Sequence, residues 1–144
     1  MIALTALVCA ALFAGAAFYV SFAEHPARMR LDERAALTEW QPSYARGAIM
    51  QALLALGGGA LGIASWYRWQ SNWFWLAGGL VLLANIPFTL LVIWGINGKL
   101  KAMAPDQPAA DTRALLTRWG QLHHVRTALG LLATLLLWYG LKPG

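Results

Sequence analysis

Residues 2–22 read IALTALVCAALFAGAAFYVSF, an apolar run without a single charged side chain. A helix that crosses a bilayer needs about 20 mostly apolar residues, so this stretch predicts a transmembrane helix. Three apolar stretches of similar length follow it, although the last opens with two histidines and an arginine. The sequence therefore predicts an all-α integral membrane four-helix bundle. It forms a single domain, residues 1–144, with helices at about 2–23, 43–67, 73–97 and 109–141, the last including a cytoplasmic extension.

The composition excludes a soluble domain. Hydrophobic residues make up 59% of the chain and charged residues only 12%, about half of the ~25% that soluble domains carry. A soluble fold of this size would lack the polar side chains to cover its surface. The net charge of +5 would suggest nucleic acid in a soluble protein, but here it is interpreted as a topology signal. We expect the lipid bilayer as a partner and no nucleic acid.

The basic residues predict the orientation. Nine of the eleven lysines and arginines lie in the two long links or at the start of the fourth helix. By the positive-inside rule these links are cytoplasmic and both termini lie on the outer side, as in a multi-pass protein of a bacterial inner membrane. Each link is expected to hold a short interfacial helix. The first covers residues 31–40 and stops before Pro42, since proline disfavours helix in the residue before it. The second begins near Pro108, since proline suits the first turn of a helix, and could run through Trp119 into the fourth span without a break.

Small residues predict close helix contacts. Gly58 and Gly62 have the spacing of a GxxxG pair, and small residues let helices approach closely in lipid, where no hydrophobic drive brings helices together. Packing within the bundle and formation of a homo-oligomer are both compatible with this pattern.

Polar residues gather where the helices are expected to end on the cytoplasmic side. In an antiparallel bundle these ends lie together, so residues distant in the sequence can converge. They are Glu24, His25, Tyr44, Arg46, Asn97, Lys99, His123, His124 and Arg126.

The start of the fourth helix has one polar stripe. Residues three or four apart share a helix face, so Trp119, His123 and Arg126 lie together, whereas His124 is turned by about 100°. We expect His123 to face the interior, because Arg126 on its stripe would otherwise face lipid. A neutral histidine can act as a general base, and Arg126 could stabilise the resulting anion.

Two other interpretations of this cluster stay open. Glu24, His25, His123 and His124 could ligate a metal, since imidazole and carboxylate suit Zn, Fe, Cu or Mn, so the expected cofactor is none or a single redox metal. The same residues could instead snorkel to lipid headgroups. Asn85, two residues before Pro87, could pair with a backbone carbonyl that the proline frees or contact a ligand.

Four stretches resemble a known family. They are FYVSFAEHPAR at 18–28, NIPFTLLV at 85–92, NGKL at 97–100 and WGQLHHVRT at 119–127. In content, order and separation they resemble the anthrone oxygenase-like family of small membrane proteins, most of unknown function. The resemblance implies a four-helix membrane bundle and oxidation of anthrones to anthraquinones with molecular oxygen. The family pattern falls on Glu24, Pro26, Asn97, Trp119, His123 and Arg126.

The resemblance implies a membrane oxygenase acting on a hydrophobic aromatic small molecule at the cytoplasmic helix ends. A base would remove the acidic benzylic proton, and Arg126 and Asn97 would hold the enolate oxygen, with Phe18, Phe88, Trp94 and Trp119 as apolar walls. The catalytic candidates are Glu24, His25, His123 and Arg126, and the substrate-binding candidates are Asn85, Trp94, Asn97, Trp119 and Arg46. The alternative is a non-catalytic accessory or assembly protein that packs through its glycine-rich helix faces.

Overall fold

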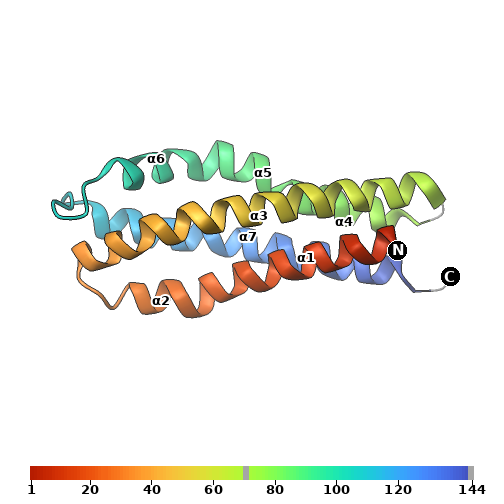
Figure 1. Ribbon diagram of the computed structural model, residues 1–144, viewed down its shortest axis with the longest axis horizontal. Coiled ribbons are helices and arrows are strands. Elements are labelled where there is room, and N and C mark those ends of the chain that lie inside the picture. The colour runs from red at the N-terminus through yellow and green to blue at the C-terminus, as the bar shows by residue number, and fades with distance from the viewer. Residues whose placement is uncertain (70–71, 143–144) are drawn as a thin grey trace.

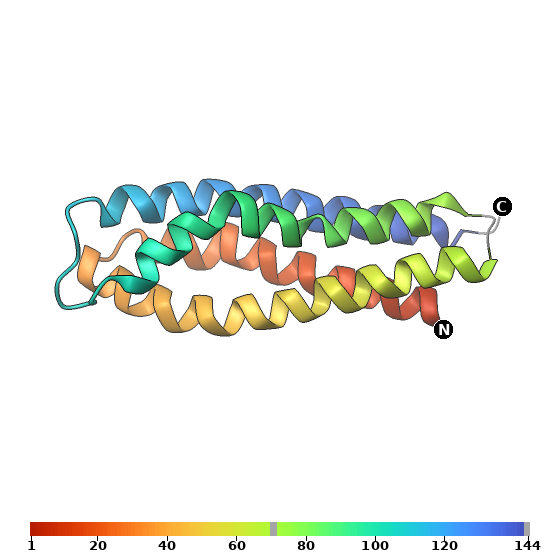
Figure 2. The ribbon, with the colours of Figure 1, turned by 90° about the horizontal axis from the view of Figure 1, so that it is seen from above.

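A computed structural model of the chain describes residues 1–69 and 72–142, and within them all regular secondary structure is helical. The elements form four helical arms that lie side by side in both views (Figures 1 and 2). The arms comprise α1 (Ile2–Tyr19), η1 (Val20–Glu24) and α2 (His25–Arg28) in the first; α3 (Glu33–Trp69) in the second; α4 (Trp73–Leu83), α5 (Asn85–Phe88), η2 (Thr89–Ile93) and α6 (Trp94–Ala102) in the third; and α7 (Thr112–Gly140) in the fourth.

The arms alternate in direction. The start of α1 and the end of α7 lie at one end of the molecule, and the links after α2 and α6 lie at the other (Figure 1). We call the latter the link end. Within the described residues α1 packs against α3 and α7, and α4 packs against the same two helices. Residues that close the first arm therefore come near residues that open the second and the fourth.

Three arms are long and apolar enough to cross a membrane, namely Ile2–Arg28, Glu33–Trp69 and Trp73–Ala102. This property indicates a membrane protein. Among the described helices α7 is long enough but is not one of these three. Its first half carries Arg113, Arg118 and Arg126, which lower its apolar character, so the fourth span stays a prediction.

The expected short helix of the first link is wrong as a separate element, whereas the helix expected after Pro108 begins at Thr112 and runs through Trp119 into the fourth arm without a break. The second arm is one helix from Glu33 to Trp69 and continues through Pro42. Asp32 Oδ1 accepts the backbone N–H of Ala35 at 2.8 Å and caps its start. Leu37 and Trp40 are fully buried, so packing holds the first turns in line although the proline removes a backbone hydrogen bond. In the second link no helix precedes Thr112 within residues 103–111.

The glycines of α3 pack against the protein's own helices. A Cβ atom placed on Gly58 would lie 2.8 Å from Cys9 Cβ of α1, and one on Gly62 would lie 3.1 Å from Gly79 Cα of α4. Both distances are too short for an unshifted side chain. Of the two interpretations of this glycine pair, packing within the protein is therefore confirmed, and this face is not free for another chain.

Two arms contain a π-helical turn, η1 in the first and η2 in the third. Such turns often occur at functional sites. The third arm is also interrupted at Ala84, three residues before Pro87. There the Asn85 side-chain amide donates to the carbonyl of Leu82 at 3.1 Å, and the Thr89 hydroxyl donates to the carbonyl of Asn85 at 2.8 Å.

Candidate active site

Two chambers lie between the helical arms. The first, the Glu24 chamber, has a volume of about 30 Å³ and is lined by Val20, Glu24, Arg28, Trp40, Ser43, Tyr44, Gly47, Ala48, Gln51, Trp119, His123 and Arg126. The second, the Asn85 chamber, has a volume of about 180 Å³ and is lined by Phe13, Tyr44, Ala48, Gln51, Ala52, Ala55, Asn85, Ile86, Thr89, Leu90 and Arg126. Four residues line both chambers, which are therefore neighbours.

Arg126 is one of the shared residues. It is only 8% exposed, and its Nη2 donates to Gln51 Oε1 at 2.8 Å. Its Nε has no hydrogen-bond partner among the described residues, and the guanidinium carbon lies 5.7 Å from the ring centroid of Phe13. Within residues 1–69 and 72–142 no carboxylate forms a salt bridge with it. A buried cation without a counter-charge is costly, so this position suits an anionic ligand.

His123 has a defined hydrogen-bond chain behind it. Its Nδ1 lies 3.1 Å from Ser21 Oγ, which lies 2.8 Å from Thr127 Oγ1, which in turn lies 3.0 Å from the carbonyl oxygen of Ala17. A carbonyl can only accept, so Thr127 donates to Ala17, Ser21 donates to Thr127, and His123 Nδ1–H donates to Ser21. This order leaves Nε2 of the neutral ring as a hydrogen-bond acceptor, and His123 is one of the residues that line the Glu24 chamber.

Burial along the start of α7 alternates as the helical period predicts. His123 is 3% and Trp119 5% exposed, whereas His124 is exposed and lies edge-on to Phe22. Trp119 Nε1 donates to Asn97 Oδ1 at 3.0 Å. Asn97 thus positions the indole ring of Trp119, and it lies outside the lining of both chambers.

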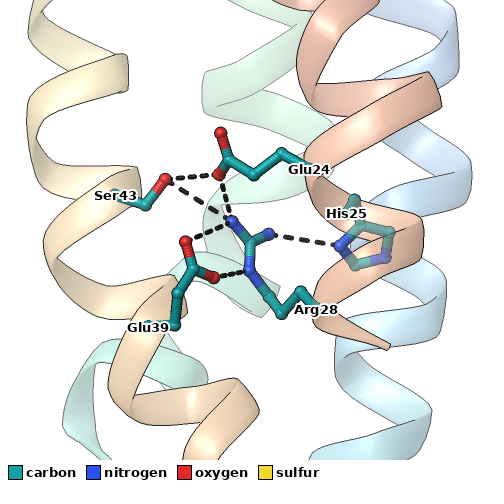
Figure 3. Close-up of polar contacts among 5 residues, drawn as sticks. All are labelled: Glu24, His25, Arg28, Glu39 and Ser43. Carbon is teal, nitrogen blue, oxygen red and sulfur yellow. Dashed lines mark hydrogen bonds and ion pairs between the residues drawn. The ribbon is translucent and has the colours of Figure 1, made fainter. Parts of the chain in front are cut away.

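Glu24 belongs to an ion network between the end of the first arm and α3, which Figure 3 shows. The Arg28 guanidinium donates to both Glu24 and Glu39, and the Ser43 hydroxyl donates to Glu24 Oε1 at 2.5 Å. The side chain of Arg28 is only 1% exposed. One buried cation is therefore matched by two carboxylates, and the Glu24 carboxylate already accepts two hydrogen bonds.

His25 lies beside this network but outside both chambers. Its Nδ1 is 3.3 Å from Arg28 Nη1, and its ring packs so closely on Gly120 that a Cβ there would overlap His25 Nε2. Any side chain at position 120 would displace this ring. The histidine therefore fastens the end of the first arm to α7.

Among the other predicted residues, Asn85 and Trp119 line a chamber. Arg46 is exposed, and Trp94 is 57% exposed with the Lys101 ammonium 5.4 Å from its ring centroid. Phe18 is 48% exposed, and neither it nor Phe88 lines a chamber. The geometry thus does not bring Arg46, Trp94 and Asn97 to a shared cavity with Asn85.

The metal-ligand hypothesis finds no matching geometry. Among the described residues no three side chains of His, Cys, Asp or Glu gather closely enough to hold a metal ion. His124 faces outward, His25 packs on Gly120, and Glu24 is bound by Arg28. The four proposed ligands therefore do not converge, and no reaction step is assigned to a metal.

Sequence reasoning missed several residues of the site. Arg28 is four residues after Glu24, a spacing that favours an ion pair on one helix face. Gln51 is an isolated amide in the apolar part of α3, and Ser21 is an isolated hydroxyl near the end of the first apolar run. Polar side chains in such positions usually face the protein interior, and that signal could have found both.

Comparisons with known proteins identify the family of the chain. The model of a family described as anthrone oxygenase matches residues 40–136, which include Tyr44, Gln51, Asn85 and Arg126. A curated protein named anthrone oxygenase, from Claviceps purpurea (strain 20.1), is 28% identical over 152 residues, covering 96% of this chain and 87% of that protein. No solved structure matches the chain. Because the family match spans more than half of its length, the chain belongs to the anthrone oxygenase family.

Proposed function

We propose that this protein is a membrane oxidoreductase that oxygenates a hydrophobic, anthrone-like aromatic substrate with molecular oxygen. The observation that carries the proposal is Arg126, a buried cation in the wall of both chambers whose hydrogen-bond partner is the neutral amide of Gln51. Such a cation suits a substrate that becomes an anion during the reaction. Membership of the family and the named relative support the reaction class.

The first step is proton abstraction. An anthrone carries a methylene group between two aromatic rings, conjugated with the opposite carbonyl, so loss of a methylene proton places negative charge on the carbonyl oxygen. Nε2 of His123 is the acceptor for this proton, because its hydrogen-bond chain through Ser21 and Thr127 leaves that nitrogen free. Arg126 binds the enolate oxygen. Glu24 is the second candidate base, although Arg28 and Ser43 already occupy its carboxylate.

The remaining steps balance with oxygen as the only co-substrate. The electron-rich methine carbon forms a C–O bond with oxygen, and the proton held by His123 completes a hydroperoxide. Loss of the second proton from this carbon and cleavage of the O–O bond give the new carbonyl and release hydroxide, which leaves as water with that proton. One anthrone and one oxygen molecule thus yield one anthraquinone and one water.

In this proposal the four arms form a transmembrane four-helix bundle in a bacterial inner membrane. Both termini lie on the outer side and the link end is cytoplasmic, in keeping with the nine basic residues at that end. Substrate reaches the chambers from the lipid, where oxygen also dissolves well. A single bound redox metal is the competing source of chemistry, and elemental analysis of the purified protein checks it.

Oxygen uptake with anthrone, measured on the purified protein in mild detergent, tests the function. We expect Arg126→Ala to lower the rate by about 10²–10³, the usual effect of removing one donor to a developing oxyanion. Arg118→Ala, which removes an exposed arginine of the same helix, should keep the wild-type rate. Wild-type uptake by a folded Arg126→Ala variant would reject the proposal.

A further inference from the structure

We infer that the Asn85 chamber is a subsite for one aromatic ring of the substrate that carries a hydroxyl group, with this hydroxyl donating to Asn85 Oδ1. The inference deepens the proposed function, on which it rests for the identity of the ligand as a ring-containing substrate. It adds a specificity that neither the family description nor the named relative contains.

The size and walls of the chamber fit one ring. Its volume of about 180 Å³ exceeds the ~150 Å³ of an apolar cavity that takes benzene. Phe13, Ala52, Ala55 and Ile86 supply apolar walls. Leu90 at its edge is 52% exposed, so the chamber reaches the outer surface of the third arm, where a ring could enter from lipid.

The polar groups of the chamber select the ligand further. Asn85 is 1% exposed, and its Oδ1 is buried without a hydrogen-bond partner among the described residues. The orientation of the amide is fixed, because the carbonyl of Leu82 can accept only from the NH₂ group. The free atom is therefore the acceptor. A buried acceptor that lacks a donor destabilises the protein, and a ligand hydroxyl would supply the donor.

No neighbouring side chain on the same wall takes this role. The Thr89 hydroxyl, one turn along the arm, donates to the backbone carbonyl of Asn85 at 2.8 Å. The guanidinium of Arg126, whose buried Nε has no partner among the described residues, offers only donors. The wall of the chamber thus contains a buried acceptor without a donor and a buried cation without a counter-charge. A ring system that carries a hydroxyl and a separate oxygen with negative charge matches both.

Binding of non-reacting probes tests the subsite. We compare 2-hydroxyanthraquinone with anthraquinone by quenching of tryptophan fluorescence, under mildly acidic conditions that keep the hydroxyl protonated. In the wild type we expect the hydroxylated probe to bind about fivefold to tenfold more tightly, the effect of one hydrogen bond. Asn85→Leu should reduce this ratio to about one. Thr134→Val, which removes a hydroxyl that donates to a backbone carbonyl of α7 and lies outside both chambers, should keep it. A ratio near one in the wild type, as for a chamber that holds only water, would overturn the inference, as would an unchanged ratio in Asn85→Leu.

A second variant covers the case in which Asn85→Leu does not fold. Ala52→Phe keeps Asn85 and adds a ring at a half-buried position in the wall of the chamber. Because this ring would fill the chamber, we expect the variant to bind neither probe. Retained binding of both would overturn the inference. Binding of the two quinones does not depend on the reaction with oxygen. If the wild type shows the expected binding ratio but no oxygen uptake with anthrone, only the oxygenase reaction is rejected. If the wild type takes up oxygen with anthrone but binds both quinones equally tightly, only the subsite is rejected.

Discussion

The molecule buries two arginines near the same chamber and treats them differently. Arg28 is held by two carboxylates, Glu24 and Glu39, and by Ser43. Arg126 has one hydrogen bond, to the neutral amide of Gln51, and its buried Nε has no partner among the described residues. Removing one partner from a buried ion pair is costly, so a fully paired charge holds the structure together. A buried charge without a counter-charge can instead bind a ligand of opposite charge. Arg28 therefore belongs to a network that holds helices together, whereas Arg126 belongs to a site that can bind an anion.

Among variants that keep both arginines, giving Arg126 a carboxylate partner should produce the largest effect. Gln51→Glu would give Arg126 a carboxylate partner, as Arg28 has. The new negative charge would then compete with the substrate oxyanion for the guanidinium. We expect oxygen uptake with anthrone to fall by about 10², the lower range for losing an oxyanion donor. Gln51→Met removes the same amide without adding charge, and its loss should be about ten times smaller. Equal losses in the two variants would show that the free charge is not what matters.

Removing each arginine in turn should separate stability from activity. Arg28→Met leaves two carboxylates without their cation, and we expect the free energy of unfolding to fall by about 2–3 kcal/mol, below the 3–5 kcal/mol for a fully buried pair because Glu39 is 40% exposed. Arg126→Met removes an unpaired buried charge and should leave the free energy of unfolding unchanged or higher. Denaturant titration in detergent micelles measures both. A larger loss in Arg126→Met would reverse the comparison.

The hydrogen-bond chain behind His123 should matter less than either arginine. In Ser21→Ala the Nδ1–H of His123 loses its acceptor, so the ring can change tautomer and Nε2 is the base for only part of the time. We expect the rate of oxygen uptake to fall by about tenfold, the effect of about 1.4 kcal/mol. The rate of Thr5→Val, which removes an exposed hydroxyl of the same arm, should stay at the wild-type value. A Ser21→Ala rate equal to wild type would leave Glu24 as the base.

The outer member of the Arg28 network should show the smallest effect. Glu39 is 40% exposed, whereas Glu24 is 23% exposed. Solvent screens the more exposed pair, so Glu39→Gln should lower the free energy of unfolding by only about 0.2–1 kcal/mol. Raising the salt concentration should reduce the difference between Glu39→Gln and the wild type. A loss as large as that of Arg28→Met would place the main interaction of Arg28 at Glu39.

The sequence predicted the parts of this molecule that follow from local periodicity. Long apolar runs predicted the helical arms, and the spacing of Trp119, His123 and Arg126 predicted which side of α7 is buried. These features need only the helical repeat and the cost of placing charge in lipid. The continuation of α3 through Pro42 was not predicted, because burial of Leu37 and Trp40 overrides a local helix-breaking signal.

The hydrogen-bond partners of the buried polar residues could not be predicted from the sequence. Gln51 and Arg126 are 75 residues apart, and their contact depends on how α3 is rotated about its axis. In a soluble helix a polar outer face would mark that rotation, but a helix in lipid is apolar on both sides. For the same reason the exposed position of Trp94 and the free Oδ1 of Asn85 became visible only in three dimensions.

The π-helical turn η1 has a consequence for how such chains can evolve. A π turn contains one more residue than the α-helical turn it replaces. Losing one residue between Val20 and Glu24 would turn η1 into an ordinary α-helical turn, and the residues after it would keep nearly the same rotation about the helix axis. Arg28 would then still face Glu39, and His25 would still face Gly120. The same deletion within α1 would instead rotate the end of the first arm by about 100° and break both contacts.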